Sequence, residues 1–262
     1  MKKITFSNSK GGVGKTTLSI NFAQILSSVG KKVLVIDIDP QANISRYFLK
    51  NEYVSNDKIM SWFRDSGIEE ISDSILKTDI KNIDIVPAWR ELNSKGSIEI
   101  SQESYSEMKL KFNLDKYNKL LGDVYDFIIF DVHPSFNNIL LNVLIAVDLI
   151  ITPIEPQIFS VEGIETMLLP LKKTVYETRK INPNFIEPKH YFIINKATKG
   201  KEHLSIISKF LEMKEIKQKI LETTIPSNIK RQKELNAKEE IKVTEKNPFF
   251  KLANELAEKE LI

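Results

Sequence analysis

A run of glycines and lysines near the start of the chain has the composition of a phosphate-binding loop. Residues 9–17 read Ser-Lys-Gly-Gly-Val-Gly-Lys-Thr-Thr. Glycines let backbone N–H groups turn toward a phosphate, and a lysine followed by a hydroxyl residue supplies a cation and a ligand for Mg²⁺. We expect Lys15 at the β- and γ-phosphates of a nucleotide, Thr16 on the metal ion and Thr17 at the α-phosphate. The backbone expected to surround the phosphates belongs to Gly11, Gly12, Val13 and Gly14. A glycine-rich turn that only joins two elements is the alternative.

Two further segments end in carboxylates that could act beside such a loop. Residues 33–39 read Val-Leu-Val-Ile-Asp-Ile-Asp, and residues 127–131 read Phe-Ile-Ile-Phe-Asp. Each has the pattern of a buried parallel strand, whose carboxyl end brings its acidic residues to the edge of the sheet where the loop also lies. Asp131 is expected to bind Mg²⁺ through water or through contact with Thr16. Asp39 precedes a proline, so a simple turn is the alternative for that position.

These residues need a parallel sheet to position them, and the rest of the chain predicts one. Short β-branched runs alternate with longer helical patterns, which is typical of an α/β fold. We therefore expect one domain over residues 1–262, with a mostly parallel twisted sheet flanked by helices. The expected strands are 3–7, 32–37, 83–86, 126–131, 149–152 and 190–195. The expected helices are 15–29, 104–121, 137–146, 160–179, 201–213 and 248–260, and residues 51–81 are expected to form short helices at one end of the sheet.

Composition excludes several classes of site. The 262 residues include no cysteine, which excludes a disulfide scaffold, cysteine-ligated zinc, an iron–sulfur cluster and a catalytic thiol. The most apolar stretch, residues 139–154, is interrupted by Asn142 and Asp148 and is shorter than a bilayer requires. With 38 Lys and Arg against 35 Asp and Glu, the net charge of +3 permits nucleic acid as a partner without requiring it. We expect a cytoplasmic protein.

The loop departs from the general phosphate-loop pattern in a way that resembles one family. The standard form places Gly at position 9, whereas this chain has Ser9 and an additional lysine, Lys10, before the paired glycines. Lys-Gly-Gly-Val-Gly-Lys-Thr-Thr resembles the deviant Walker A motif of the ParA/MinD family of ATPases. Asp-Ile-Asp-Pro-Gln-Ala-Asn, residues 37–43, is similar to the Walker A′ motif of ParA proteins. The chain is most like the short, Soj-type ParA proteins, which carry no helix-turn-helix domain ahead of the loop.

The resemblance implies roles for individual residues. It implies that Lys10 contacts the nucleotide of a partner subunit, with a solvated lysine as the alternative. Lys10, Lys15 and Asp39 would then form the catalytic set, with Asp39 orienting or activating the attacking water. Asp37, with Thr16 and Asp131, would support the Mg²⁺ ion. The resemblance also places adenine between the loops of Asn195 and Pro226, although Asn195 could equally be an ordinary turn residue.

Basic residues late in the chain are candidates for binding DNA. Residues 227–233 read Ser-Asn-Ile-Lys-Arg-Gln-Lys, and Lys196, Lys199 and Lys201 form a second basic stretch. Lysine and arginine bind phosphates without reading bases, which gives salt-sensitive, nonspecific affinity. The resemblance makes Lys230 and Arg231 the candidate contacts. A solvated helix face is the alternative, because glutamates follow closely.

Taken with these residues, the resemblance implies a partition ATPase. Such a protein uses ATP and Mg²⁺, forms a homodimer on ATP, binds nonspecific DNA at the nucleoid and hydrolyses ATP weakly until a ParB-like partner stimulates it. The alternative is a MinD-like ATPase that cycles on a membrane. That alternative requires a basic amphipathic tail, whereas residues 248–260 are acidic on balance and are expected to pack on the sheet. The related iron protein requires cluster cysteines, which this chain lacks.

Overall fold

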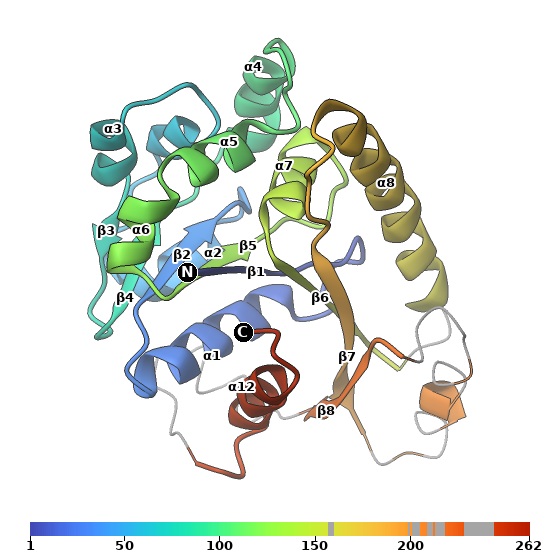
Figure 1. The fold of residues 1–262 in the computed structure, drawn as a ribbon. Helices are drawn as coiled ribbons and strands as arrows, with labels where there is room; N and C mark the ends of the chain where they lie inside the picture. Colours follow the sequence, from blue (N-terminus) through green and yellow to red (C-terminus); the bar gives the residue numbers. More distant parts are fainter. Residues whose placement is uncertain (157–159, 199, 201–204, 209–211, 213–217, 228–243) are drawn as a thin grey trace.

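The structure is a computed structural model that describes residues 1–156, 160–198, 200, 205–208, 212, 218–227 and 244–262. The described residues form an eight-stranded sheet in the order β3-β4-β2-β5-β1-β6-β7-β8 (Figure 1). All neighbouring strands are parallel except β3, which pairs antiparallel with β4. The strands are β1 (Lys2–Phe6), β2 (Val33–Asp37), β3 (Leu76–Lys77), β4 (Ile83–Val86), β5 (Phe127–Asp131), β6 (Leu149–Ile154), β7 (Lys189–Ala197) and β8 (Ile220–Pro226). The predicted fold class is confirmed.

Helices cover both faces of the sheet, which explains why most residues of its central strands are apolar. Every residue of β2, β5 and β6 is buried. On one face, α1 (Lys15–Ser28), α2 (Asn43–Leu49) and α12 (Pro248–Glu258) contribute to one apolar cluster. On the other, α5 (Lys109–Lys116), α6 (Asn118–Val124), α7 (Asn138–Ala146) and α8 (Ser160–Ile181) contribute to a second. Figure 1 shows α1 and α12 together on one side of the sheet and α5 and α7 on the other.

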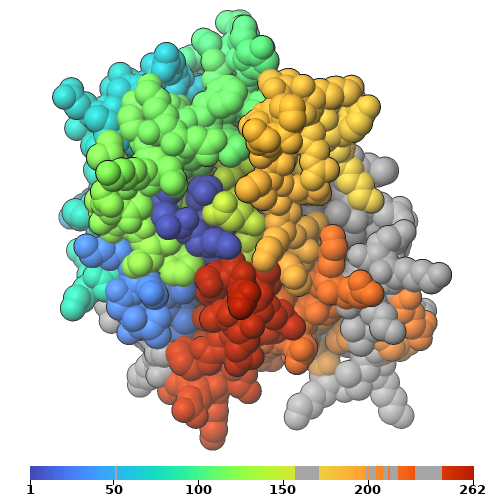
Figure 2. Space-filling model, in the orientation of Figure 1, coloured from blue at the N-terminus to red at the C-terminus, as the bar shows by residue number. Residues whose placement is uncertain are grey.

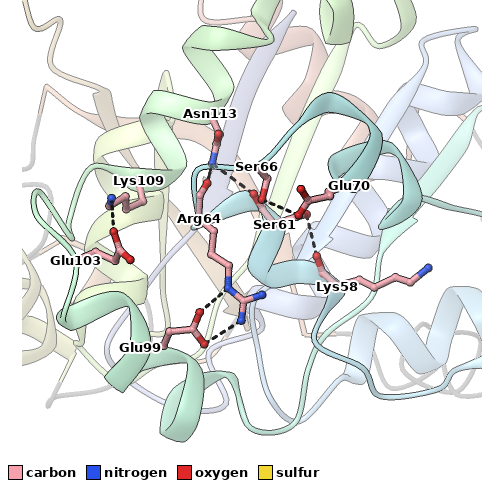
Figure 3. Close-up of polar contacts among 9 residues, drawn as sticks. All are labelled: Lys58, Ser61, Arg64, Ser66, Glu70, Glu99, Glu103, Lys109 and Asn113. Carbon is pink, nitrogen blue, oxygen red and sulfur yellow. Dashed lines mark hydrogen bonds and ion pairs between the residues drawn. The ribbon is translucent and has the colours of Figure 1, made fainter.

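The segment expected to hold short helices does so. It contains the helical turns η1 (Lys50–Glu52) and η2 (Lys58–Trp62) and the short helix α3 (Ile68–Asp73). The side chain of Asn113 on α5 holds this segment in place. It donates a hydrogen bond to the Trp62 carbonyl at 3.0 Å and another, drawn in Figure 3, to the Arg64 carbonyl at 2.6 Å. The Arg64 guanidinium in turn contacts the Glu99 carboxylate on α4 (Ser97–Ser101), which follows η3 (Leu92–Gly96). One buried amide therefore satisfies carbonyls that a loop would otherwise leave without partners.

The prediction was wrong for the bounds of one helix and missed two strands. The helix expected over 104–121 begins only at Lys109 and breaks at Tyr117, whose φ and ψ of −106° and 13° end α5 before α6 begins. Strands β3 and β8 were not expected. Strand β8 is an edge strand with exposed polar residues, so its hydrophobic pattern is weak, and its proline is tolerated at the strand end. Of the helix expected over 201–213, residues 205–208 are helical, and most of the rest lies outside the described residues.

The C-terminal helix packs on the protein, as expected from its sequence. Phe249, Leu252 and Leu256 of α12 are buried, and the helix lies against α1 and β8. The Glu255 carboxylate accepts hydrogen bonds from the backbone N–H groups of Glu222 and Thr223 at 2.7 and 2.8 Å. In Figure 2 the C-terminal residues, in red, form a continuous surface with the blue residues of the first part of the chain. None of the helices in the described part is long and apolar enough to span a bilayer.

Candidate functional site

The order of the strands brings the loop and the carboxylates to one edge of the sheet. Strand β5 lies between β1 and β2, with Phe6 opposite Asp131 on one side and Asp37 opposite Asp131 on the other. All three strands are parallel, so their carboxyl ends coincide. The chain leaves β1 directly into the loop of residues 7–14. The structure therefore brings the loop, Asp37 and Asp131 to the same edge of the sheet, and their roles toward a nucleotide stay predictions.

The loop has the backbone conformation that its glycines predict. Gly12 and Gly14 have φ values of +75° and +91°, which residues other than glycine rarely adopt. A Cβ atom on Gly14 would lie 2.5 Å from the Nδ2 atom of Asn195. Gly14 is also the N-cap of α1 and has no side chain with which to cap the first N–H groups of that helix. These N–H groups are therefore available to an anion.

Lys15 lies inside the loop. Its side chain is buried, with the residue 6% exposed, and its Nζ atom donates a hydrogen bond to the Lys10 carbonyl at 3.2 Å. Burial lowers the pKa of Lys15, while the charges of Asp131 and Asp39 raise it. The Lys15 ammonium is therefore close enough to Asp131 and Asp39 for their charges to act on it.

Asp131 contacts the helix that follows the loop. Its carboxylate accepts hydrogen bonds from the Thr16 hydroxyl at 2.8 Å and the Ser19 hydroxyl at 3.3 Å. The side chain is completely buried, and this burial raises the pKa of Asp131 to about 7. The contact between Asp131 and Thr16 is the one that the sequence predicts for a shared metal ion.

Asp37 and Asp39 have different surroundings. The Asp37 carboxylate is completely buried and accepts hydrogen bonds from the Ser45 N–H at 3.0 Å and hydroxyl at 2.6 Å, and from the Asp39 N–H at 3.1 Å. Burial, together with the nearby charge of Asp131, raises the pKa of Asp37 well above its ordinary value. The Asp39 carboxylate, on a residue that is 7% exposed, accepts a hydrogen bond from the Gln41 N–H at 2.9 Å. Asp39 therefore does form the turn proposed as the alternative, and its charge also acts on Lys15.

The donor atoms at this edge fit a magnesium ion bound together with phosphates. The Thr16 hydroxyl and the carboxylates of Asp37, Asp39 and Asp131 are hard oxygen ligands, which Mg²⁺ prefers. Across the described part of the chain, no three acidic or histidine side chains gather into a metal cage. Mg²⁺ is usually held by one or two carboxylates plus substrate phosphates, which agrees with this arrangement. Burial raises the pKa values of Asp37 and Asp131, which means that their negative charges are unfavourable in this site. A divalent cation would compensate these negative charges.

The two predicted adenine-contacting residues lie near each other at the end of the sheet. Pro226 pairs in register with Ala197, so it lies beside the end of the strand that carries Asn195. The Asn195 side chain is buried, and its Nδ2 atom donates a hydrogen bond to the Val13 carbonyl at 2.7 Å. The next residue, Lys196, donates from Nζ to the Gly12 carbonyl at 2.5 Å. The structure thus ties Asn195 to the phosphate loop, and its contact with a base stays a prediction.

Sequence reasoning missed several residues that hold the site together. Ser19 and Ser45 are ordinary helix residues in the sequence, yet each binds a site carboxylate. The Asn8 side chain joins the loop to β6, accepting from the Lys10 N–H at 2.8 Å and donating to the Pro153 carbonyl at 2.8 Å. Only the position of Asn8 two residues after β1 could have indicated its role.

The predicted DNA contacts are not placed. Lys230 and Arg231 lie outside the described residues, as do Lys199 and Lys201 of the second basic stretch. Lys196 of that stretch forms an ion pair with Glu155 and binds the phosphate loop. It therefore belongs to the candidate site.

Comparisons with known proteins identify relatives of this chain. A family described as an AAA domain matches residues 1–185. An uncharacterised protein of Methanocaldococcus jannaschii is 36% identical over 203 residues, which cover 76% of this chain and 74% of that protein. The sporulation initiation inhibitor protein Soj of Bacillus subtilis is 32% identical over 167 residues, which cover 64% of this chain and 63% of Soj. The match therefore spans a little under two thirds of Soj.

A solved structure extends the similarity over the whole fold. A Borrelia burgdorferi B31 protein, proposed to act in plasmid partition and bound to AMPPNP, superposes with a TM-score of 0.71 at 25% identity. The superposition covers 99% of this chain and 98% of that one.

Proposed function

Because the chain belongs to the ParA/MinD family of ATPases, we propose that it binds ATP with Mg²⁺ and hydrolyses it to ADP and phosphate in DNA partition. The observation that supports this most is the loop itself. Lys15 is buried within it, the first N–H groups of α1 follow it, and Asp131 meets Thr16 beside it. These groups match the charges of a triphosphate and its metal ion.

The chain's own residues would divide the work of hydrolysis. Lys15 and the backbone of residues 11–14 hold the phosphates, with Thr17 at the α-phosphate, and Thr16 and Asp131 hold the metal ion, supported by Asp37. The metal ion supplies charge neutralisation on the phosphate oxygens. Asp39 orients or activates the water for attack on the γ-phosphate, since its carboxylate lies close enough to Lys15 to raise the pKa of that lysine.

A second copy of the chain would complete this site. Lys10 has a half-buried side chain, and its backbone is fixed by Asn8 and Lys15 on either side. No atom outside the adjoining residues of the described chain lies within 4 Å of a Cβ placed on Gly11 or Gly12. This exposed surface permits the close approach of another subunit. We propose that ATP produces a homodimer in which Lys10 contacts the partner's nucleotide and stabilises charge in the transition state.

The proposed cycle connects this dimer to DNA. The ATP-bound dimer binds nonspecific DNA at the nucleoid in the cytoplasm, through Lys230 and Arg231, and a ParB-like partner accelerates an otherwise weak hydrolysis. The membrane-cycling alternative is disfavoured because the apolar side chains of α12 are buried against α1 and β8. Helix α12 therefore has no exposed apolar face to insert in a lipid surface.

One experiment separates these possibilities. The protein is sedimented with DNA in the presence of ATP, ADP or no nucleotide across a salt series, with anionic liposomes in parallel. We expect binding to DNA only with ATP, and a loss of binding as salt rises. The Lys15→Ala variant, which removes the buried ammonium, should not bind DNA under any condition. Liposome binding with ATP would select the membrane alternative, and ATP-independent DNA binding would contradict the proposed switch.

A further inference from the structure

The end of β7 directs two consecutive side chains at the phosphate loop. Asn195 donates from Nδ2 to the Val13 carbonyl, and Lys196 donates from Nζ to the Gly12 carbonyl. In a regular strand, successive side chains point to opposite faces of the sheet. Two neighbours can reach the same loop only if the strand is locally irregular.

The backbone at Lys196 supplies that irregularity. Its φ is +54°, in the left-handed region that residues other than glycine seldom occupy. The pairing of β7 with β8 shifts register between Ile194 and Ala197, where this residue lies. Irregularities of this kind redirect side chains and often occur beside functional sites. A strained lysine persists only where surrounding contacts hold it in place.

These two hydrogen bonds fix the direction of the loop's N–H groups. In a trans peptide, the carbonyl of one residue and the N–H of the next point in opposite directions. Fixing the Gly12 carbonyl therefore orients the Val13 N–H, and fixing the Val13 carbonyl orients the Gly14 N–H. Lys15 acts in the same way from within, because its bond to the Lys10 carbonyl orients the Gly11 N–H. The N–H groups of such loops are what surround a phosphate.

The Lys196 ammonium also joins the loop to another segment. It forms an ion pair with Glu155, a buried residue that is 8% exposed at the side chain and directly follows β6. The Lys196 side chain itself is 39% exposed. Glu155 lies in the connection from β6 to α8. One ammonium therefore contacts both the phosphate loop and the connection that leads to α8.

We propose that Lys196 is a positioning residue that holds the phosphate loop ready for nucleotide and links it to the connection before α8. Together with Asn195, it keeps the Val13 and Gly14 N–H groups turned toward the phosphate site before any ligand arrives. The inference rests on the proposed function only in taking the ligand to be a nucleoside triphosphate.

The test compares Lys196→Met with Lys189→Met. Both lysines are on β7, but Lys189 is exposed at the strand's start and donates to the Glu260 carbonyl at 3.5 Å, away from the loop. We expect Lys196→Met to raise the Kd for a fluorescent ATP analogue with Mg²⁺ about tenfold, the loss typical of one charge-assisted hydrogen bond. Lys189→Met should leave the Kd unchanged. Lys196→Arg, which keeps the cation, should recover most of the affinity.

A double variant tests whether weaker nucleotide binding by Lys196→Met is only a consequence of lower protein stability. Lys196→Met leaves the Glu155 carboxylate buried without its lysine, so the double variant Lys196→Met/Glu155→Gln removes both charges. It should melt close to wild type and still bind the analogue about tenfold more weakly. An unchanged Kd in this variant would overturn the proposal.

Hydrogen exchange of the nucleotide-free protein makes the test independent of the proposed function. We expect amides of residues 12–14 to exchange faster in Lys196→Met than in wild type or Lys189→Met. Equal exchange in all three would overturn the positioning role even if ATP binds. If wild type fails to bind the ATP analogue but exchange differs as expected, the proposed ATPase function fails and the positioning role stands.

Discussion

Replacing Asp131 by asparagine should stabilise the nucleotide-free protein and weaken its response to magnesium nucleotide. The carboxylate is completely buried at the end of β5, with the second buried carboxylate of Asp37 opposite it on β2. Asparagine has nearly the same shape and can still bond to the hydroxyls of Thr16 and Ser19, which now hold the carboxylate. The substitution therefore removes a buried charge with little loss of hydrogen bonding.

The size of the effect follows from the pKa. Burial raises the pKa of Asp131 from 3.8 to about 7, and each pKa unit corresponds to about 1.4 kcal/mol. Because Asp37 shares the same environment, we expect Asp131→Asn to raise the free energy of unfolding at pH 8 by about 2 to 4 kcal/mol. Between about pH 4 and pH 7 the folded state holds this proton more tightly than the unfolded state does. The stability that the folded state gains from this tighter binding of the proton on Asp131 is thus fully present below pH 4 and is lost as pH rises through 7.

Denaturant unfolding in EDTA at pH 4.5, 6 and 8 would measure this effect. The wild type should lose stability relative to Asp131→Asn as pH rises, and the melting temperature of the variant at pH 8 should be higher by roughly 5 to 10 °C. Asp123→Asn, on the exposed surface of α6, should track the wild type. Magnesium ATP should then stabilise the wild type far more than Asp131→Asn. A variant no more stable than wild type at pH 8 would show that the carboxylate is already compensated, and would refute the reasoning.

Three other substitutions test separate parts of the molecule. Lys10→Ala should leave the Kd for ATP within about threefold of wild type, because Lys15 contacts the nucleotide bound by its own chain. The same variant should lose stimulated turnover. A large loss of ATP binding would contradict the separate roles of Lys10 and Lys15. Asp39→Ala should bind ATP and elute as a dimer in size-exclusion chromatography, and a monomer under those conditions would refute its role in hydrolysis. His190 is buried against Thr152, and burial lowers its pKa to about 3, so the wild type should lose about 2 to 3 kcal/mol of stability as pH falls from 7 to 4.5, below the unfolded pKa of about 6.5. The free energy of unfolding of His190→Gln should fall less over the same pH range, by about the amount that His190 contributes. If the free energies of unfolding of wild type and variant change identically with pH, His190 is not a buried neutral histidine.

The parts of the site that were predictable are continuous in the sequence. The phosphate loop, its strand and its helix occupy the first 28 residues, and local chemistry is enough to define their geometry. Asp37 and Asp131 were predictable for a related reason. Each ends an apolar run, and parallel strands buried on both faces bring such ends to one edge whatever their separation in sequence.

The unpredicted parts depend on backbone irregularities and long-range contacts. Nothing in the local sequence around Lys196 requires a left-handed residue, because the conformation is held by the loop and by Glu155. The break at Tyr117 between α5 and α6 contains no proline or glycine from which it could be predicted. Asn195 has a contact that its residue type alone does not predict. Its Nδ2 atom binds the Val13 carbonyl of the phosphate loop, and the expected contact of this amide with a base stays a prediction.

The electrostatics of the site explain why metal and phosphate should bind together. Burial lowers the pKa of Lys15 and raises the pKa values of Asp37 and Asp131, so burial alone disfavours all three charged forms. Phosphates favour the charged form of Lys15 but repel the two carboxylates, and a divalent cation favours the ionised carboxylates but repels Lys15. Only a ligand carrying both charges stabilises all three groups. We therefore expect ATP in EDTA to bind much more weakly than magnesium ATP, and Asp131→Asn to reduce that difference by removing the carboxylate that repels free ATP.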